Sequence, residues 1–270
     1  MLPTTSALIK KYNLNAKKSF GQNFILDSNL TDKIAKCAGD LSNFEVLEIG
    51  PGPGSLTRSI LKQNPQKLTV IEMDTRFLPL LGEIKSTYPN LEIVGDDALK
   101  IDEKKLVSNK PFKIIANLPY NVGTELVFKW IENQDLDIDL MILMLQKEVV
   151  ERIVAGPGNK KYGRLAVMVN FLCETEYLFD VSASSFTPPP KVTSSLVKII
   201  PKKIKVEKSQ VKKLSWIVQA AFNQRRKKIR SSLKSVNSNI EMVLAKLNID
   251  QNLRAEQLTI SQFVLIANSV

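Results

Sequence analysis

The chain has 270 residues, 44% of them hydrophobic and 24% charged, and its formal net charge is +11 at pH 7. This length and apolar content exclude a disordered or fibrous chain and favour one large domain with a smaller second one. Histidine is absent, which excludes Ser-His-Asp and Cys-His catalytic centres and zinc sites that use histidine. Without a membrane-length apolar run or a cysteine pair at metal-site spacing, we expect a cytoplasmic protein that binds no metal.

The first half of the sequence alternates short apolar runs with helical segments. The apolar runs predict five strands, at 45–49, 68–71, 91–94, 112–116 and 139–145. Ser55, directly after the glycine cluster at 50–54, is expected to cap a helix. Strands and helices alternating at this spacing predict a mostly parallel, doubly wound α/β sheet, in which ligands bind at the carboxyl ends of the strands.

The second half of the sequence changes in composition after Pro201. Segments 174–181 and 191–200 predict a closing hairpin pair, and residues 164–172 fit either a helix or a strand. Residues 1–201 carry 24 basic and 23 acidic side chains, whereas residues 202–270 carry 14 and 4. We therefore predict a domain at 1–201 and a basic helical domain at 202–270 that binds a polyanion, with a solvated basic surface as the alternative. The candidate polyanion contacts are Arg225, Arg226, Lys227, Lys228 and Arg230.

Glycines and a carboxylate follow the first two predicted strands. Gly50 and Gly52 would let a ligand approach the backbone closely, and Glu72 lies 22 positions beyond Gly50. An acidic residue at this spacing binds the hydroxyls of a ribose, so the pattern predicts a nucleoside-containing cofactor, with a plain structural turn as the alternative.

The loop itself narrows the choice of cofactor. Pro51 and Pro53 remove two N–H groups that a pyrophosphate would need, and Glu48 adds negative charge. S-adenosylmethionine has a ribose, no phosphate and two cationic groups, and it fits this loop. Asp97, after the third strand, could accept a hydrogen bond from the adenine amine or simply cap a helix.

The fourth predicted strand ends at the segment Asn117-Leu118-Pro119-Tyr120. The Asn117 side-chain oxygen and the Leu118 carbonyl could accept the hydrogens of a nucleobase amine as its nitrogen becomes tetrahedral. Tyr120 offers a flat ring on which the base can stack. This chemistry needs no histidine.

Together these segments resemble the ribosomal RNA adenine N6,N6-dimethyltransferases of the bacterial small-subunit type. The resemblance spans nearly the whole chain and depends on seven segments: 20–24, 48–54, Glu72, Asp97, 117–121, 186–192 and 222–227. It implies S-adenosylmethionine contacts at Asn23, Ile25, Gly50, Glu72, Asp97 and Asn117. It further implies transfer of four methyl groups to two adjacent adenosines in the 3′-terminal hairpin loop of small-subunit rRNA, within pre-30S particles, by a protein that we expect to be a monomer.

Two matching segments have a physical interpretation of their own. Phe186 precedes three prolines, a stiff arm that could hold its ring against a target base, although a core aromatic is the alternative. Asn23 and Ile25 could fold over the cofactor as a lid or pack an N-terminal arm. The chain departs from the commonest family pattern at Ile25, where leucine is usual, and at Pro53.

Three other functions remain open at this point. The nearest is the sister family of antibiotic-resistance methyltransferases, which modify one adenosine of large-subunit rRNA. A non-catalytic ribosome-assembly factor that kept the fold is the second, and an NAD-dependent oxidoreductase is a distant third. Intact Asn117, Tyr120 and Glu72 argue against the second, and the proline-containing loop against the third.

Overall fold

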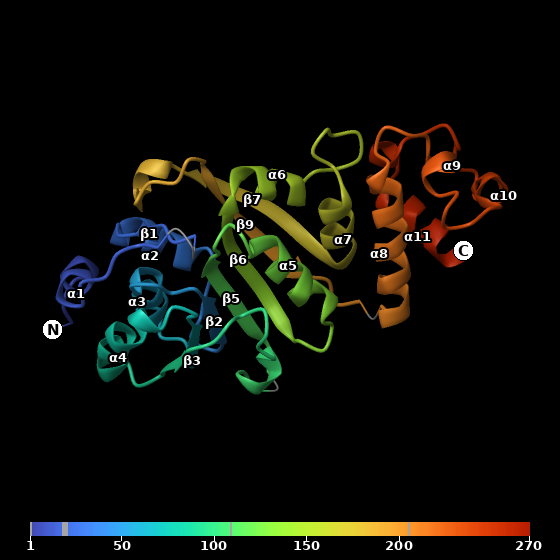
Figure 1. Ribbon diagram of the computed structural model, residues 1–270. Coiled ribbons are helices and arrows are strands. Elements are labelled where there is room, and N and C mark those ends of the chain that lie inside the picture. Colours follow the sequence, from blue (N-terminus) through green and yellow to red (C-terminus); the bar gives the residue numbers. More distant parts are fainter. Residues whose placement is uncertain (1, 18–20, 109, 205) are drawn as a thin grey trace. The chain divides into compact units, whose positions relative to one another are not determined.

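The computed structural model describes residues 2–17, 21–108, 110–204 and 206–270, and the chain divides into two compact units (Figure 1). The first unit comprises Met1–Val150 and Glu176–Pro201, and the second comprises Glu151–Thr175 and Lys202–Val270. One border falls after Pro201, where the composition changes. Glu151–Thr175, which the sequence placed with the large domain, belongs to the second unit.

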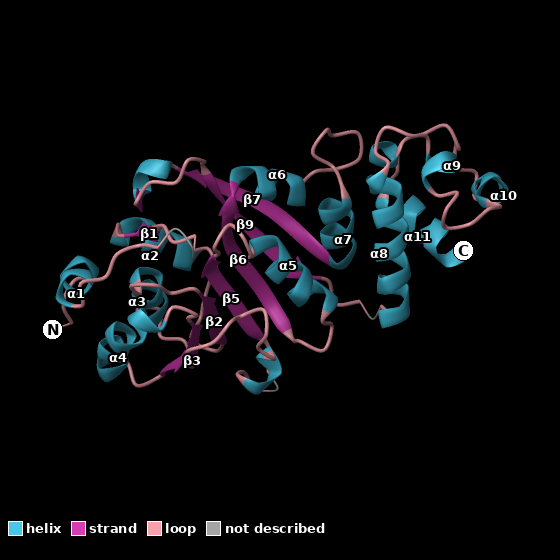
Figure 2. Ribbon diagram, viewed as in Figure 1, coloured by secondary structure: helices cyan, strands magenta, loops and turns pink. Residues whose placement is uncertain are grey.

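A seven-stranded sheet organises the first unit, in the order β4-β3-β2-β5-β6-β9-β7 (Figure 2). β2 pairs in parallel with both β3 and β5, the pairs β3–β4 and β5–β6 are also parallel, and β9 runs antiparallel to β6. The strands are β2 (Glu45–Ile49), β3 (Lys67–Ile71), β4 (Leu91–Val94), β5 (Phe112–Asn117), β6 (Ile138–Gln146), β7 (Cys173–Val181) and β9 (Ser194–Pro201). A separate antiparallel pair joins β1 (Phe24–Ile25) to β8 (Phe186–Thr187). The predicted mostly parallel α/β sheet and the C-terminal helices are confirmed.

The central strands form where the sequence has near-continuous apolar runs. Leu47, Val70 and Ile114 are fully buried, as parallel strands covered on both faces require. β7 and β9 are neighbours, as the predicted hairpin pair requires, and residues 164–172 form a helix rather than a strand.

Helices connect these strands and make up most of the second unit. They are α1 (Thr5–Lys11), α2 (Ser28–Lys36), α3 (Ser55–Leu61), α4 (Leu78–Thr87), α5 (Gly123–Glu132), α6 (Lys147–Ile153), α7 (Arg164–Leu172), α8 (Lys208–Asn223), α9 (Ile229–Ser232), α10 (Ile240–Lys246) and α11 (Ile260–Ser269). No helix in the described part of the chain has the length and apolar character needed to cross a bilayer.

The start of α3 differs from the prediction that Ser55 is its cap. Ser55 is the first helical residue, and Gly54 occupies the cap position with φ +77°. A Cβ on Gly54 would lie 2.5 Å from Ile84 Cδ1, so both the backbone conformation and the packing against α4 require glycine.

The strand order places a switch point between β2 and β5. The chain proceeds outward from β2 to β3 and β4, and it then returns to the other side of β2 as β5. Loops that leave the carboxyl ends of adjacent strands in opposite directions open a crevice, which is the usual ligand site of such sheets.

α8 organises the second unit. Its apolar side, with Leu214, Ile217 and Val218 buried, packs against α7 and α11. The Phe222 ring lies 6.0 Å from that of Tyr162 and 5.8 Å from that of Phe263, between centroids. The C-terminal helices predicted from the sequence therefore pack around a core.

Candidate cofactor and active site

A cavity opens at the carboxyl ends of the central strands, at the switch point between β2 and β5. Six predicted cofactor residues line it: Asn23, Ile25, Gly50, Gly52, Glu72 and Asp97. Three predicted catalytic residues line it as well: Asn117, Leu118 and Tyr120. The fold thus brings nine of the ten predicted cofactor and catalytic residues to one cavity.

The glycine loop forms one wall of this cavity. Gly50 and Gly52 have φ values of +65° and +52°, a region that side chains rarely adopt. A Cβ on Gly52 would lie 3.3 Å from Phe24 Cε1, a tight contact, so the positive φ and the close approach of the N-terminal segment both favour glycine. The Gly52 N–H donates to Glu72 Oε2 at 2.9 Å, which locks the loop to the end of β3.

Glu72 is buried and held by the backbone. Its side chain has 5% exposure, and its Oε1 accepts a hydrogen bond of 2.8 Å from the Asp74 N–H. Burial raises the pKa of this carboxyl, and the two backbone donors oppose that rise. Each carboxylate oxygen keeps a second lone pair, which can accept a hydrogen bond from a ribose hydroxyl.

Glu48 lies beneath the glycine loop, is 1% exposed and lines the cavity. In the described part of the chain its Oε2 has no hydrogen-bond partner. Burial, together with the nearby Glu72 carboxylate, raises the pKa of Glu48 to about 8. Glu48, expected from the sequence to carry a negative charge, is shifted by burial toward its protonated form, and a neighbouring cation would favour the ionised form.

Asp97 caps a turn and also lines the cavity. Its Oδ1 accepts a hydrogen bond of 3.0 Å from the Leu99 N–H and so caps a turn, while Lys100 Nζ lies 3.7 Å from Oδ2. The side chain still lines the cavity, where a carboxylate oxygen can accept from an amine. Capping and ligand binding are compatible here.

The acceptor segment follows β5. Asn117 Nδ2 donates to the Asn23 carbonyl at 3.4 Å, so the amide orientation directs Oδ1 to the acceptor role. The Leu118 N–H donates to the Met144 carbonyl at 3.1 Å, which anchors the residue whose carbonyl is the second predicted acceptor. Tyr120 is half-buried, and its hydroxyl lies 2.7 Å from Ser194 Oγ, which holds the ring in place.

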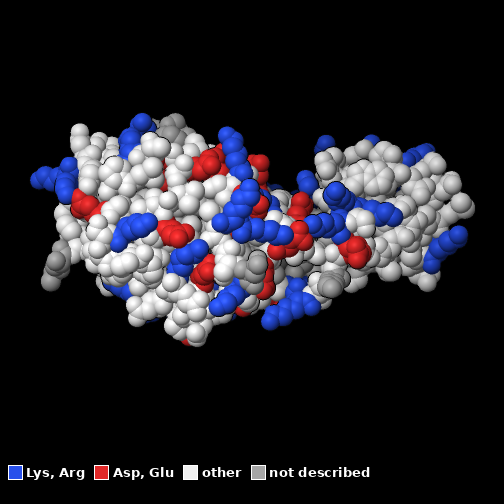
Figure 3. Space-filling model, turned by 90° about the horizontal axis from the view of Figure 1, so that it is seen from below, with Lys and Arg blue, Asp and Glu red and all other residues white. Residues whose placement is uncertain are grey.

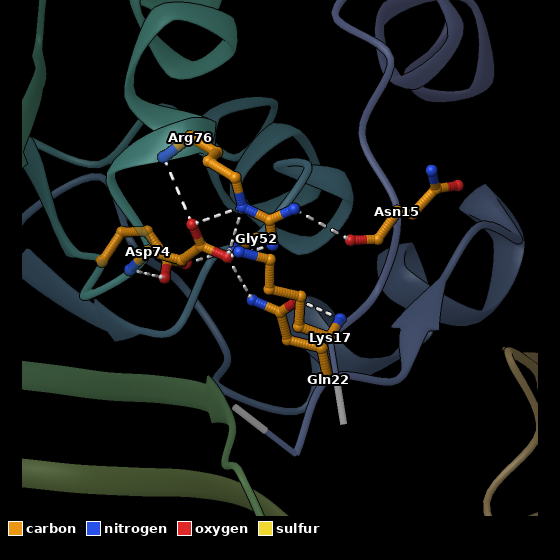
Figure 4. Close-up of polar contacts among 7 residues, drawn as sticks. Asn15, Lys17, Gln22, Gly52, Asp74 and Arg76 are labelled. Atoms are coloured by element: carbon orange, nitrogen blue, oxygen red, sulfur yellow. Dashed lines mark hydrogen bonds and ion pairs between the residues drawn. The ribbon is translucent and has the colours of Figure 1, made fainter. Parts of the chain in front are cut away.

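A polar network that the sequence did not predict ties the N-terminal segment to β3 (Figure 4). Asp74, 4% exposed, accepts hydrogen bonds from Gln22 Nε2 at 2.9 Å and from Arg76 Nε at 2.8 Å. Gln22 Oε1 in turn accepts from the Lys17 N–H, and Arg76 Nη1 donates to the Asn15 carbonyl. Hydrogen bonds from Arg76 lower the pKa of Asp74 to about 2. We call Asn15–Lys17, Gln22, Asp74 and Arg76 the arm network.

Phe186 is placed differently from its predicted stacking role. It lies in β8 opposite Ile25, is 3% exposed, and belongs to the hydrophobic core rather than to the cavity wall. The alternative of a core aromatic describes its position in this structure, and a stacking role for Phe186 stays a prediction. Phe20, in the first resemblance segment, lies outside the described residues.

Comparisons with known proteins assign the chain to a protein family. Residues 13–270 match the family described as "Ribosomal RNA adenine dimethylase". The chain belongs to the ribosomal RNA adenine dimethylase family. It is 46% identical over 270 residues to the "Ribosomal RNA small subunit methyltransferase A" of Allorhizobium ampelinum, covering 99% of this chain and 97% of that protein. The protein of the same name from Agrobacterium fabrum is 47% identical over 271 residues, covering 99% of this chain and 97% of that protein.

Solved structures agree with this membership. A dimethyladenosine transferase from Plasmodium falciparum has a TM-score of 0.75 and 28% identity, covering 89% of this chain and 94% of that one. The 23S rRNA methyltransferase ErmE has a TM-score of 0.70 and 25% identity, covering 92% of this chain and 99% of that one. The predicted family, methyltransferase class and S-adenosylmethionine cofactor are confirmed by this membership.

The basic run of this dimethylase-family chain lies in the second unit. That unit holds 18 basic and 6 acidic residues, against 20 and 21 in the first. In Figure 3, basic (blue) and acidic (red) side chains are mixed over the first unit. The right-hand end of the picture, which is part of the second unit, shows basic side chains and hardly any acidic ones. The border found in the structure thus sharpens the charge contrast.

The members of the run are not equivalent. Arg225 Nε donates to Glu256 Oε2 at 2.9 Å and its Nη2 donates to the Lys160 carbonyl, so this side chain already has partners within its own unit. Lys228 Nζ donates to Asn252 Oδ1 at 2.9 Å, and Arg230 is half-buried. Arg226 and Lys227 are exposed. Lys228 is exposed as well, but its hydrogen bond to Asn252 leaves Arg226 and Lys227 as the two members best placed to reach a polyanion.

Proposed function

We propose that the chain transfers methyl groups from S-adenosylmethionine to N6 of two adjacent adenosines in the 3′-terminal hairpin loop of small-subunit rRNA, four methyl groups in all. The substrate is the rRNA within pre-30S particles. The observation that carries the proposal is the single cavity that unites the Glu72 carboxylate with the acceptor segment Asn117–Tyr120.

The residues of the cavity fit this cofactor. Glu72 and Asp97 offer carboxylate oxygens for ribose hydroxyls and an adenine amine, and the glycine loop leaves room where a Cβ would intrude. The unpartnered Oε2 of Glu48 suits a cationic group rather than a phosphate. When bound, S-adenosylmethionine supplies an electrophilic methyl group.

The chain's own residues then act on the adenine. The adenine amine is planar and a poor nucleophile because its lone pair is delocalised into the ring. Asn117 Oδ1 and the Leu118 carbonyl would accept hydrogen bonds from its two N–H groups as the nitrogen becomes tetrahedral. These hydrogen bonds strengthen in the transition state. Tyr120, held by Ser194, would stack on the base.

The comparisons support small-subunit rRNA over the alternatives. The relatives at 46 and 47% identity are named for the small subunit, whereas the 23S enzyme is 25% identical. The intact acceptor segment argues against a non-catalytic assembly factor. We further propose that the chain acts as a monomer, in the cytoplasm, and that Arg226 and Lys227 contact rRNA phosphates.

Transfer of labelled methyl groups tests the proposal. Purified chain and labelled S-adenosylmethionine are incubated with immature 30S particles, and the rRNA nucleosides are then analysed. We expect N6,N6-dimethyladenosine, four methyl groups per particle, with little transfer to naked small-subunit rRNA and none to large subunits. Labelling of large subunits alone would instead support the sister function, and no transfer to any of these substrates would contradict the proposal.

A further inference from the structure

Trp216 is an exposed aromatic on the basic helix of the second unit. Its exposure is 51%, although the other tryptophan, Trp130, is 1% exposed and donates from Nε1 to Glu103 Oε1 at 2.7 Å. An exposed aromatic ring can stack on a partner, and the side chains around Trp216 decide which kind of partner it fits.

The surroundings of Trp216 indicate the chemistry of that partner. On α8, exposed residues recur at helical spacing and form one stripe on the side opposite the buried core: Ser209, Lys212, Lys213, Trp216, Gln219 and Asn223. α8 contains no acidic residue, so every side chain of this stripe is either basic or uncharged. We call these six residues the α8 stripe.

A basic stripe with one aromatic at its centre matches nucleic acid that has unpaired bases. Lysines bind the phosphates without regard to sequence, and an aromatic ring stacks on a base, which a fully paired duplex does not offer. A membrane fits less well, because the apolar side of α8 is already buried in its own unit. We infer that the α8 stripe binds an unpaired segment of RNA, with Trp216 stacking on a base and Lys212 and Lys213 contacting phosphates.

This inference rests on the proposed rRNA function but adds a surface distinct from the cavity and from the exposed pair Arg226 and Lys227. The two tryptophans make it measurable in the full chain. Intrinsic fluorescence is recorded while the chain is titrated with a hairpin carrying an unpaired loop, with a single-stranded oligonucleotide, or with a fully paired RNA duplex.

We expect the hairpin and the single strand to quench the emission in wild type and not in Trp216→Phe excited at the same wavelength, where only the buried Trp130 reports. Trp216→Ala should weaken RNA binding by about tenfold, whereas Trp216→Phe should stay within about threefold because it keeps a ring. Lys212→Gln with Lys213→Gln should reduce the salt slope of binding by about 1.4, since each single-strand phosphate contact contributes about 0.7.

A matched control is Met242→Ala on α10, where Met242 is 60% exposed in the same unit. It should bind RNA as wild type does, and all variants should melt as wild type does. Equal affinity of Trp216→Ala and wild type, equal quenching by the duplex, or a response to anionic vesicles alone would overturn the inference. Methyl transfer to 30S particles is measured in parallel. If the enzyme transfers methyl groups but RNA neither quenches Trp216 nor loses affinity in Trp216→Ala, only the RNA-binding role of the α8 stripe is contradicted. If no methyl groups are transferred, only the proposed function is contradicted.

Discussion

Glu48 illustrates how burial sets the chemistry of a single residue. Its pKa is raised from an ordinary 4.5 to about 8, so the protonated carboxyl stabilises the fold fully below about pH 4.5. That contribution is lost as the pH rises through about 8, where the buried group must ionise. The sequence suggested the location of Glu48 but gave it a charge, because burial depth depends on tertiary packing.

The first prediction concerns the pH dependence of stability. Glu48→Gln removes the ionisable group, so we expect the variant to match wild type near pH 5 and to exceed it by about 2–5 kcal/mol at pH 9. The measurement is the free energy of unfolding in urea across this range without cofactor. Glu92→Gln, at an exposed position on β4, serves as the control and should show no such divergence. Parallel curves for Glu48→Gln and wild type would contradict the buried-acid interpretation.

The N-terminal arm is the element that sequence patterns described least well. Asn23 and Ile25 were predicted near the cofactor from the family resemblance, but the contacts that hold them there join residues far apart, such as Gln22 and Asp74. Hydrophobic periodicity identifies strands because burial is repeated along them. A hydrogen bond between two distant polar side chains leaves no repeated signal, so the arm network became visible only in the structure.

The second prediction tests the arm network. Asp74→Asn removes the charge that Gln22 and Arg76 share, so we expect the arm to open more often and the affinity for S-adenosylmethionine to fall about five- to tenfold. Calorimetry measures the affinity, and hydrogen exchange at the Gln22 and Asn23 amides measures the opening. Glu83→Gln is the matched control, because Glu83 accepts from Lys11 and Tyr12 in and beside α1 but does not contact Gln22. An equal loss of affinity in both variants would show that the network has no specific role.

The strands themselves were predictable for a physical reason. Parallel strands buried on both faces are near-continuous apolar runs, so the runs at 68–71 and 112–116 lie within β3 and β5. The position of the cavity was predictable as well, because the carboxyl ends of parallel strands lie along the same edge of the sheet. The direction of the Phe186 ring was not predictable in this way, because a ring at a strand end can face either the core or a ligand.

At the scale of the whole molecule, charge is divided between the two units. The first unit is close to neutral and contains the cavity, whereas the second has 18 basic against 6 acidic residues. In the proposed function, cofactor binding and polyanion binding therefore belong to different units. The sequence indicated it in outline, but it could not show that Glu151–Thr175 belongs to the basic unit, because membership depends on packing rather than on chain order.

The third prediction follows from the unequal exposure of the basic run. Arg226→Gln with Lys227→Gln should weaken binding to 30S particles and reduce its salt slope by about 2, because each phosphate contact contributes about 0.9. Arg225→Gln should instead lower stability by at most about 1 kcal/mol, since its partially exposed pair with Glu256 is a weak one. Binding titrations at several salt concentrations and thermal melts separate the two effects. If Arg225→Gln reduced the salt slope of binding as much as the double variant does, the assignment of Arg226 and Lys227 as the phosphate contacts would be contradicted.

The most direct test of the whole account is the kinetics of Asn117→Ala. If the side-chain oxygen of Asn117 accepts an amino hydrogen chiefly in the transition state, kcat for methyl transfer to 30S particles should fall by about 100-fold or more. KM for the 30S particles should change by less than about threefold, because binding of the particle depends on other residues. A variant with unchanged kcat and a raised KM would contradict the account, since Asn117 would then serve binding alone.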